Sequence, residues 1–137
     1  MRGQVGSQSC SQCGSTWVLG GQSILGSGAS VQKTFLLSSA HSKVNVTLEL
    51  LAIGSWDYER FKVFVDDALV FTSNRVLHCC QELVSTYCDS TPTPLRFSFI
   101  TNHTSTLLKL NITTTLDEHA YNEAFGVKRV SLKPLDG

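Results

Sequence analysis

The segment Lys43–Ile53, which reads KVNVTLELLAI, decides the fold of this chain. Apolar and polar residues alternate along it one by one, and the apolar set is Val44, Val46, Leu48 and Leu50. A strand turns successive side chains to opposite faces, whereas a helix repeats about every 3.6 residues. The segment is therefore predicted to be a β-strand with one buried and one polar face, and its β-branched residues favour the same structure.

The same alternation predicts further strands on both sides of this one. They lie at Trp17–Leu19, Ile24–Leu25, Ser30–Leu37, Leu95–Phe99, Leu108–Ile112 and Phe125–Leu132. A hairpin is predicted over Arg60–Phe71, with its turn at Asp66, and a second hairpin is predicted to turn at Thr101–Ser105. In the last strand the apolar residues change from odd to even positions between Val127 and Val130, which predicts a β-bulge.

Two parts of the chain are distinguished by composition. Residues 1–16 are rich in Gly, Ser and Gln and are predicted to form an irregular arm that carries Cys10 and Cys13. Residues 17–137 are predicted to form one all-β domain, an antiparallel β-sandwich of jelly-roll-like topology. Residues 74–94 have mixed polarity and are expected to hold a short helix or a long cysteine-bearing loop. The length of 137 residues fits a single domain with its own core.

The charge balance argues against several classes of function. The chain carries 11 basic and 11 acidic residues, so its net charge is zero with neutral histidines. It lacks the overall positive charge that binds nucleic acid or an anionic membrane, and neither partner is expected. No apolar run approaches the ~18 residues that span a bilayer. Met1–Ser7 is polar and does not resemble a secretory leader, so we expect a mature or truncated form.

Three of the five asparagines lie in N-glycosylation sequons, at Asn45-Val46-Thr47, Asn102-His103-Thr104 and Asn111-Ile112-Thr113. About one would arise by chance in a chain so rich in Ser and Thr. Asn45 and Asn111 fall on polar faces of predicted strands and Asn102 falls in a turn, so all three are predicted to face solvent. Because sequons are used only in the secretory pathway, the chain is predicted to be an extracellular or cell-surface glycoprotein.

The chain has an odd number of cysteines, namely Cys10, Cys13, Cys79, Cys80 and Cys88. In a secreted chain this number predicts disulfides, with one free thiol or one bond to another chain. Two internal bridges can be drawn in about 15 ways, so the pairing stays open. Zinc binding is the weaker alternative, because the adjacent pair Cys79-Cys80 does not fit the usual spacing of a tetrahedral site.

Two acidic loops, Gly54–Glu59 and Leu116–Glu123, each join two predicted strands. If they meet at one edge of the sandwich, their oxygens could bind Ca²⁺, which takes about six to eight such ligands. The candidate ligands are Asp57, Glu59, Asp117, Asn122 and Glu123. The simpler explanation is that these residues form turns and caps. Calcium is therefore a possible cofactor, and no other cofactor is expected.

Aromatic residues accompany the acidic loops. Trp56, Tyr58 and Tyr121 could stack on a sugar ring, although Trp56 is explained more simply as a core residue. A hydrolase built on Glu59 and Glu123 is disfavoured, because a sandwich of this size leaves little room for a cleft. The chain also lacks the common catalytic motifs, and its four histidines are scattered. It is therefore predicted not to be an enzyme.

The string Gly54–Asp66, with Leu116–Glu118 and Asn122–Val127, resembles a module of secreted and surface proteins of ciliates and other protists. It is similar, more distantly, to jelly-roll ectodomain modules whose last strand carries an aromatic-Gly-Ile/Val signature. The resemblance covers roughly Trp17–Leu132, and it implies an extracellular jelly-roll sandwich used for adhesion, sugar binding or assembly. Such modules often place an acidic residue after this signature, where this chain has Lys128-Arg129. Calcium binding is therefore not carried over to this strand.

The preferred hypothesis is a non-catalytic structural subunit that assembles with copies of itself, or with neighbouring extracellular proteins, into a surface fibre or matrix. An arm of ~16 residues can extend up to ~50 Å, so it could reach a neighbouring sheet edge or form an intermolecular disulfide. The alternative is a calcium-assisted, lectin-like carbohydrate-binding module that uses Trp56, Asp57, Tyr58 and Tyr121.

Overall fold

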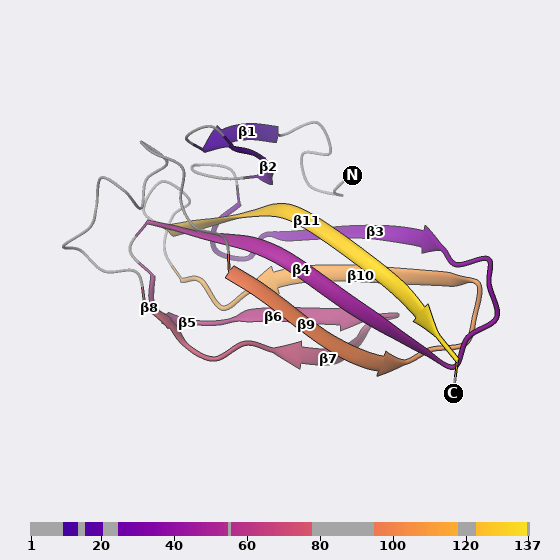
Figure 1. Cartoon of the computed structure of the whole chain (residues 1–137). Coiled ribbons are helices and arrows are strands. Elements are labelled where there is room, and N and C mark those ends of the chain that lie inside the picture. Colours follow the sequence, from indigo (N-terminus) through magenta and orange to yellow (C-terminus); the bar gives the residue numbers. More distant parts are fainter. Residues whose placement is uncertain are drawn as a thin grey trace.

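The computed structural model describes residues 10–13, 16–20, 25–54, 56–77, 95–117 and 123–136. This part of the chain consists of strands, turns and bends, which confirms the all-β prediction (Figure 1). It includes no helix of the length and apolar character that crossing a membrane requires.

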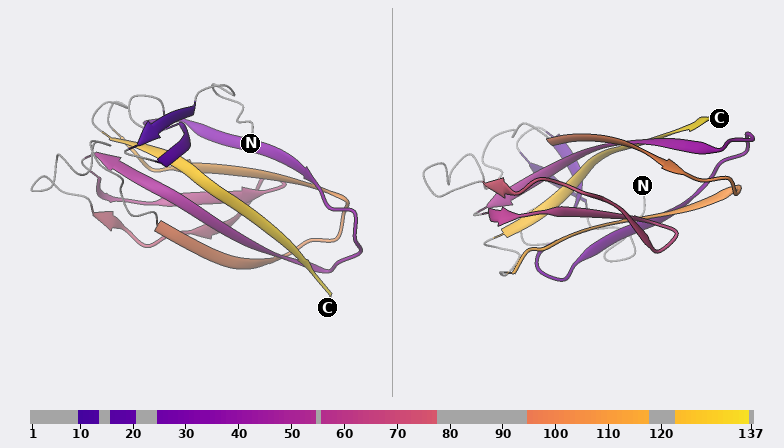
Figure 2. Two further views of the ribbon diagram at one scale, coloured as in Figure 1. Left: turned by 45° about the horizontal axis from the view of Figure 1, so that its top comes forward. Right: turned by 90° about the horizontal axis from the view of Figure 1, so that it is seen from below.

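Two antiparallel sheets pack face to face as a sandwich (Figure 2). The five-stranded sheet has the order β1 (Cys10–Cys13), β2 (Thr16–Gly20), β11 (Glu123–Leu135), β4 (Lys43–Gly54) and β9 (Leu95–Asn102). The four-stranded sheet has the order β3 (Ser30–Leu36), β10 (Leu107–Thr114), β6 (Phe61–Val65) and β7 (Ala68–Thr72). A separate pair joins β5 (Asp57–Glu59) to β8 (Val76–Leu77).

The order of the long strands is that of a jelly roll. The strand β2 lies beside the last strand, β11, and consecutive long strands alternate between the two sheets except at the hairpin β6–β7. Such alternation produces the paired Greek-key crossings of a jelly roll and confirms the predicted topology. The predicted bulge is also present, as a register shift between Val127 and Arg129.

The core lies between the sheets and is centred on β4. Its inward side chains, Val44, Val46, Leu48 and Leu50, are completely buried. They pack in one cluster with inward residues of the four-stranded sheet, including Phe61, Val63, Leu108, Leu110 and Ile112. The alternation seen in the sequence is therefore the alternation between core and outer face. Near the end of β4 this rule stops, because Leu51 and Ile53, on the outer parity, are buried too and pack with Ala124.

Trp56 closes the core at the end where β4 leads into β5. Its ring is fully buried and lies 4.7 Å from the ring of Phe61, centroid to centroid. The indole Nε1–H donates a hydrogen bond of 2.8 Å to the carbonyl oxygen of Ala124 in β11. Because a buried indole N–H needs a partner, this bond lets the large ring sit in the core without an unsatisfied donor.

The predicted connection at Thr101–Ser105 is wrong. The segment was expected to join a hairpin, but β9 pairs with β4 in one sheet, whereas β10 pairs with β3 and β6 in the other. The chain therefore crosses from sheet to sheet here. Alternation predicts that a strand exists and which face is apolar, but the pairing partner is set by contacts distant in sequence.

The first cysteine-bearing segment is more regular than expected. Cys10–Cys13 forms β1 and pairs antiparallel with β2, which joins it to the five-stranded sheet. Residues 1–9 of the predicted arm lie outside the described residues, as do most of residues 74–94. The side chains of Cys10 and Cys13 are not described, and Cys79, Cys80 and Cys88 lie outside the described ranges, so the disulfide prediction stays open.

Two buried histidines join the loops at the opposite end of the sandwich. The nearly parallel rings of His41 and His103 bring Nε2 of His41 to 2.9 Å from Nδ1 of His103. The other nitrogen of His41 lies 2.8 Å from the carbonyl oxygen of Ser39. The other nitrogen of His103 lies 3.1 Å from the carbonyl oxygen of Leu107 and 3.2 Å from Oδ2 of Asp66. Both outer nitrogens therefore face acceptors.

Removing the Trp56 ring is expected to destabilise the domain strongly. Trp56→Ala should lower the free energy of unfolding by about 3–5 kcal/mol, because it leaves a cavity in the core. Urea unfolding followed by circular dichroism measures this change. Tyr58→Ala is the matched control, since its neighbouring ring is exposed, and it should change stability by no more than about 0.5 kcal/mol. Equal effects of both substitutions would disprove the assigned role of Trp56.

Candidate functional site

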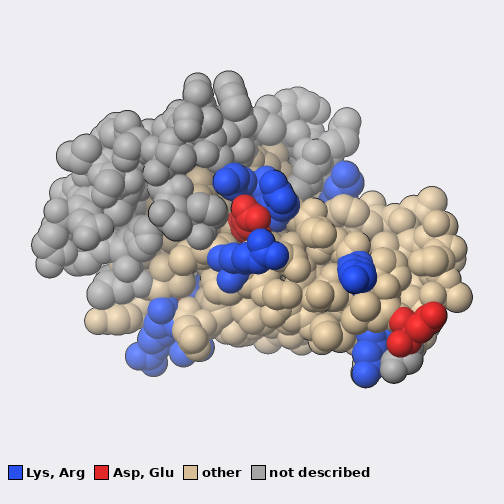
Figure 3. All heavy atoms as spheres, viewed as in Figure 1, with Lys and Arg blue, Asp and Glu red and all other residues tan. Residues whose placement is uncertain are grey.

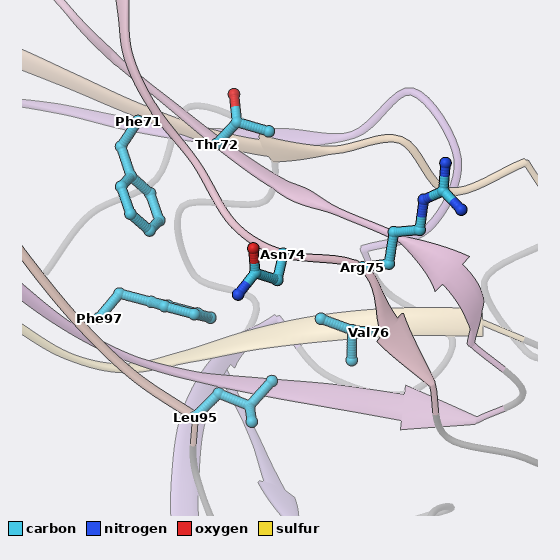
Figure 4. A pocket seen from close by; sticks show the side chains of 7 residues that line it. All are labelled: Phe71, Thr72, Asn74, Arg75, Val76, Leu95 and Phe97. Carbon is cyan, nitrogen blue, oxygen red and sulfur yellow. The ribbon is translucent and has the colours of Figure 1, made fainter.

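A pocket opens at the edge of the sandwich, where β7 and β9 form the outermost strands of their sheets. Its volume is about 450 Å³, within the range of about 300–1,000 Å³ found for small-molecule sites. The lining residues are Phe71, Thr72, Asn74, Arg75, Val76, Leu95 and Phe97 (Figure 4). They come from β7, from the segment that leads to β8, from β8 itself and from β9.

The wall of the pocket is aromatic. The rings of Phe71 and Phe97 come from different sheets and lie 5.4 Å apart, tilted by 50°. Phe99 stacks on Phe71 at 5.0 Å, and Phe61 lies behind Phe97 at 5.8 Å. Phe71 and Phe97 are only partly buried, although Phe61 behind them is completely buried. The pocket wall is therefore the outer layer of the core, held firmly from behind.

The rim of the pocket is polar. Thr72, Asn74 and Arg75 are all exposed. In Figure 4 the carboxamide of Asn74 projects toward Phe97, whereas the guanidinium of Arg75 points away from both phenylalanine rings. A carboxamide offers both donors and an acceptor, so one side chain can bind a hydroxyl group in either role. The pocket thus combines flat apolar surfaces with an adaptable hydrogen-bonding group.

Ser73 holds this rim against the four-stranded sheet. It is buried, its backbone N–H donates to the carbonyl oxygen of Phe61, and its Oγ accepts from the N–H of Phe61, both at 2.9 Å. The same hydroxyl donates to the carbonyl oxygen of Asn74 at 2.8 Å. Arg60 adds a longer bond of 3.4 Å to the Ser73 carbonyl oxygen. The backbone at Asn74 is therefore held next to the four-stranded sheet by hydrogen bonds.

The acidic and aromatic loop predicted from the sequence lies beside this pocket. In the pairing of β5 with β8, Glu59 lies opposite Val76, which lines the pocket, and Asp57 lies opposite Leu77. Tyr58 is the extra residue of a bulge between them, and its φ is 78°. Such a backbone conformation is strained for a large side chain and turns the ring outward, where it is 58% exposed.

The other two aromatic residues predicted to stack on a sugar are Trp56 and Tyr121, and neither is seen exposed to solvent. Trp56 is completely buried in the core, so its ring is not open to stack on a sugar. This is the simpler explanation that the sequence analysis kept for it. Tyr121 lies outside the described residues. Tyr58 is therefore the predicted sugar-stacking residue that the structure places in solvent.

The two acidic loops do meet at one end of the sandwich. Glu123, the first residue of β11, pairs with Gly54 at the end of β4. Within the described ranges, however, no group of three or more His, Cys, Asp or Glu residues is arranged to hold a metal ion. Asp117 is exposed and Glu59 is buried, whereas Asn122 and the side chains of Asp57 and Glu123 are not described. Calcium binding stays a prediction.

The three sequon asparagines lie on different parts of the surface. Asn45 lies on the outer face of β4, and its Oδ1 accepts a bond of 3.1 Å from Ser98. Asn102 is exposed at the end of β9. Asn111 lies on the outer parity of β10 and is partly buried, and its Oδ1 is a buried acceptor that makes no hydrogen bond within the described structure. Their glycosylation stays a prediction.

The sequence analysis did not find the pocket itself. Phe71 and Phe97 were recognised as strand residues, but Asn74, Arg75 and Val76 were grouped with the long irregular segment. The pocket depends on two strand edges that meet across the sandwich, and no spacing within either strand signals that meeting.

Comparison with known proteins identifies the fold and no family. No protein-family model matches the chain, and no curated protein sequence matches it. Among solved structures, the chain is similar to a latent form of PorU from Porphyromonas gingivalis, with a TM-score of 0.64 and 12% identity over 88% of the chain. The match spans only 11% of that PorU chain.

Two other similar structures are described as sugar-binding. One is a family 35 carbohydrate-binding module from an environmental isolate, with a TM-score of 0.55, 13% identity and coverage of 99% of this chain and 89% of that one. The other is the C-terminal domain of EclA, a sugar-binding protein, with a TM-score of 0.53, 13% identity and coverage of 83% and 71%. Identities this low show a shared β-sandwich fold. The resemblance to protist surface modules stays a prediction.

Removing the Ser73 hydroxyl is expected to loosen the rim of the pocket. Ser73→Ala leaves the buried N–H of Phe61 without its partner, which should lower the free energy of unfolding by about 1–3 kcal/mol. Urea unfolding measures this loss of stability. The rate of amide hydrogen exchange should increase most at Phe61. Ser105→Ala removes an exposed hydroxyl and serves as control. Unchanged exchange at Phe61 would refute the role of Ser73.

Proposed function

We propose that this chain is a non-catalytic carbohydrate-binding module that takes a neutral sugar in the pocket between β7 and β9. The observation that carries the proposal is the combination of two partly buried phenylalanine rings with the Asn74 carboxamide at one open cavity. This proposal keeps the lectin-like alternative of the sequence analysis, but it uses the pocket instead of Trp56, Asp57 and Tyr121, and it does not require calcium.

The chemistry of the pocket suits a sugar ring. A pyranose presents apolar C–H groups on its faces and hydroxyl groups at its edge. Phe71 and Phe97 provide flat apolar surfaces, and Asn74, whose carboxamide projects toward Phe97, provides donors and an acceptor beside them. Tyr58, on the strand paired with β8, adds an exposed ring to the same region. The sugar-binding descriptions of two structurally similar proteins support the proposal.

A binding role is favoured over hydrolysis by the lining of the pocket. Glycoside hydrolysis commonly needs two carboxyl groups that flank the scissile bond. Among the described residues, those that line this pocket include Asn, Arg and Thr but neither Asp nor Glu. Glu59 lies close in the strand pairing, but it is buried and engaged in contacts of its own. The described lining therefore supplies groups for recognition without an acid and base pair.

The proposed setting is outside the cell. The three sequons support this location, and Asn45 and Asn102 lie where an attached glycan would extend into solvent. Assembly into a fibre or matrix stays a prediction, because it rested on cysteine side chains and on an arm of which residues 1–9 lie outside the described ranges.

The test is binding to a panel of neutral oligosaccharides, followed by titration calorimetry with the best ligand. Asn74→Ala should weaken binding by about 2- to 13-fold, as expected for one net hydrogen bond of about 0.5–1.5 kcal/mol. Phe97→Leu should weaken it as well, because it removes the flat ring and keeps an apolar side chain.

The matched control is Asn102→Ala, which removes an equally exposed asparagine at the other end of the sandwich. It should leave the affinity unchanged. The proposal fails if no neutral sugar binds, or if Asn74→Ala and Asn102→Ala have the same effect on a folded protein.

A further inference from the structure

The outer face of the five-stranded sheet carries a cluster of charged residues apart from the pocket (Figure 3). At its centre, the Glu49 carboxylate of β4 lies 3.6 Å from Arg96 Nη1 of β9. Lys128 Nζ and Arg129 Nε of β11 lie 3.9 and 3.8 Å from the same carboxylate. We call these four residues the cationic cluster.

A β-bulge in β11 builds this cluster. Val127 pairs with Leu50 and Arg129 pairs with Glu49, so Lys128 is the extra residue between them. In a regular strand two neighbouring side chains would point to opposite faces. The bulge breaks this alternation and re-aims the strand, so both basic residues reach the same carboxylate.

The cluster has more positive charge than its carboxylate can neutralise. Three cationic side chains surround one carboxylate, and the excess is therefore two positive charges. The side chain of Glu49 is only 13% exposed, whereas those of Arg96 and Arg129 are 69% and 65% exposed. Each guanidinium has five N–H donors, and a single contact with Glu49 leaves most of them open to a ligand. Glu49 thus acts as a positioning residue beneath an exposed basic surface.

Neutral hydrogen-bonding groups extend this surface along the sheet. Thr47 and Ser98 lie next to the cluster and share a hydrogen bond of 3.3 Å. Ser98 also donates to Asn45, and Ser131 lies opposite Thr47 on β11. The strands β9 and β11 lie on either side of β4, so their outer side chains are roughly 10 Å apart. The result is a flat strip with charged groups at one end and hydroxyl groups beyond them.

We propose that this strip binds an anionic polysaccharide, whose carboxylate or sulfate groups contact Arg96 and Arg129 while its hydroxyl groups contact the neutral strip. Charge complementarity identifies the partner, since guanidinium groups bind such oxyanions with two parallel hydrogen bonds. Nucleic acid fits less well, because the outward residues described beside the cluster offer no aromatic ring for base stacking. The net charge of zero hides this local excess.

This site is separate from the pocket, although both use β9. Leu95 and Phe97 face the pocket, whereas Arg96 and Ser98 alternate with them on the outer face. The proposal does not depend on neutral sugar binding, and each site has its own variants. Loss of one activity with retention of the other is therefore directly observable.

The test is affinity electrophoresis, which measures the mobility of the full chain in gels that contain polygalacturonate, dextran sulfate or neutral dextran. Single-stranded DNA serves as a competitor. At low salt at least one polyanion should retard the chain in the gel. Any retardation by neutral dextran should not depend on the residues of the cationic cluster. Arg96→Gln/Arg129→Gln should weaken polyanion binding by about tenfold or more. Binding should also fall steeply between about 50 and 200 mM salt.

The charge-matched control is Lys33→Gln/Lys62→Gln, which removes two positive charges from the four-stranded sheet. It should change the affinity by less than about twofold, because both lysines lie on the other sheet of the sandwich and cannot contact a ligand bound at the cationic cluster. The measurements use protein before and after removal of N-linked glycans, because a glycan on Asn45 would share this face. The proposal is overturned if neither polyanion binds, if both double variants weaken binding equally, or if DNA is bound more tightly than both polysaccharides. A preference for polygalacturonate or for dextran sulfate identifies the anionic group.

Discussion

Burial of one face of β4 against the four-stranded sheet is the interaction on which the rest of the structure depends. This strand pairs with β11 on one side and with β9 on the other, and its inward side chains are completely buried. Once that face is fixed, the opposite face must lie outward. It then carries Asn45, Thr47 and Glu49, and the end of the strand delivers Trp56 to the core.

The strand β9 shows how one element can serve two surfaces. Among the described strands β9 is the last of its sheet, and its residues alternate between the pocket and the outer face. Phe97 belongs to the aromatic wall, whereas Arg96 belongs to the cationic cluster. A jelly-roll sandwich with little internal room can therefore carry binding sites on an edge and on a face. Neither requires the deep cleft that catalysis would need.

Local irregularities, more than the regular sheet, place the candidate binding groups. The bulge between Val127 and Arg129 brings two basic side chains to one carboxylate. The bulge at Tyr58 turns an aromatic ring into solvent beside the strand that lines the pocket. Bulges commonly re-aim side chains next to functional sites. The surrounding pairing holds both conformations, and in β5 it also holds a positive φ that costs energy.

The sequence by itself determined most of the long strands and which side of each is apolar, because a period of two is a local property that needs no partner. It predicted the hairpin β6–β7, the bulge of β11 and the outward position of Asn45, and it favoured a core position for Trp56. The short apolar pair Ile24–Leu25 was wrongly predicted as a strand, since Leu25 lies in a bend, and the strand Cys10–Cys13 was missed. Only the tertiary structure decided that β9 pairs with β4 and that Asn74 projects toward Phe97. Both features depend on pairings and contacts between segments that are distant in the sequence. The most stable of the possible pairings is the one that buries the most apolar surface.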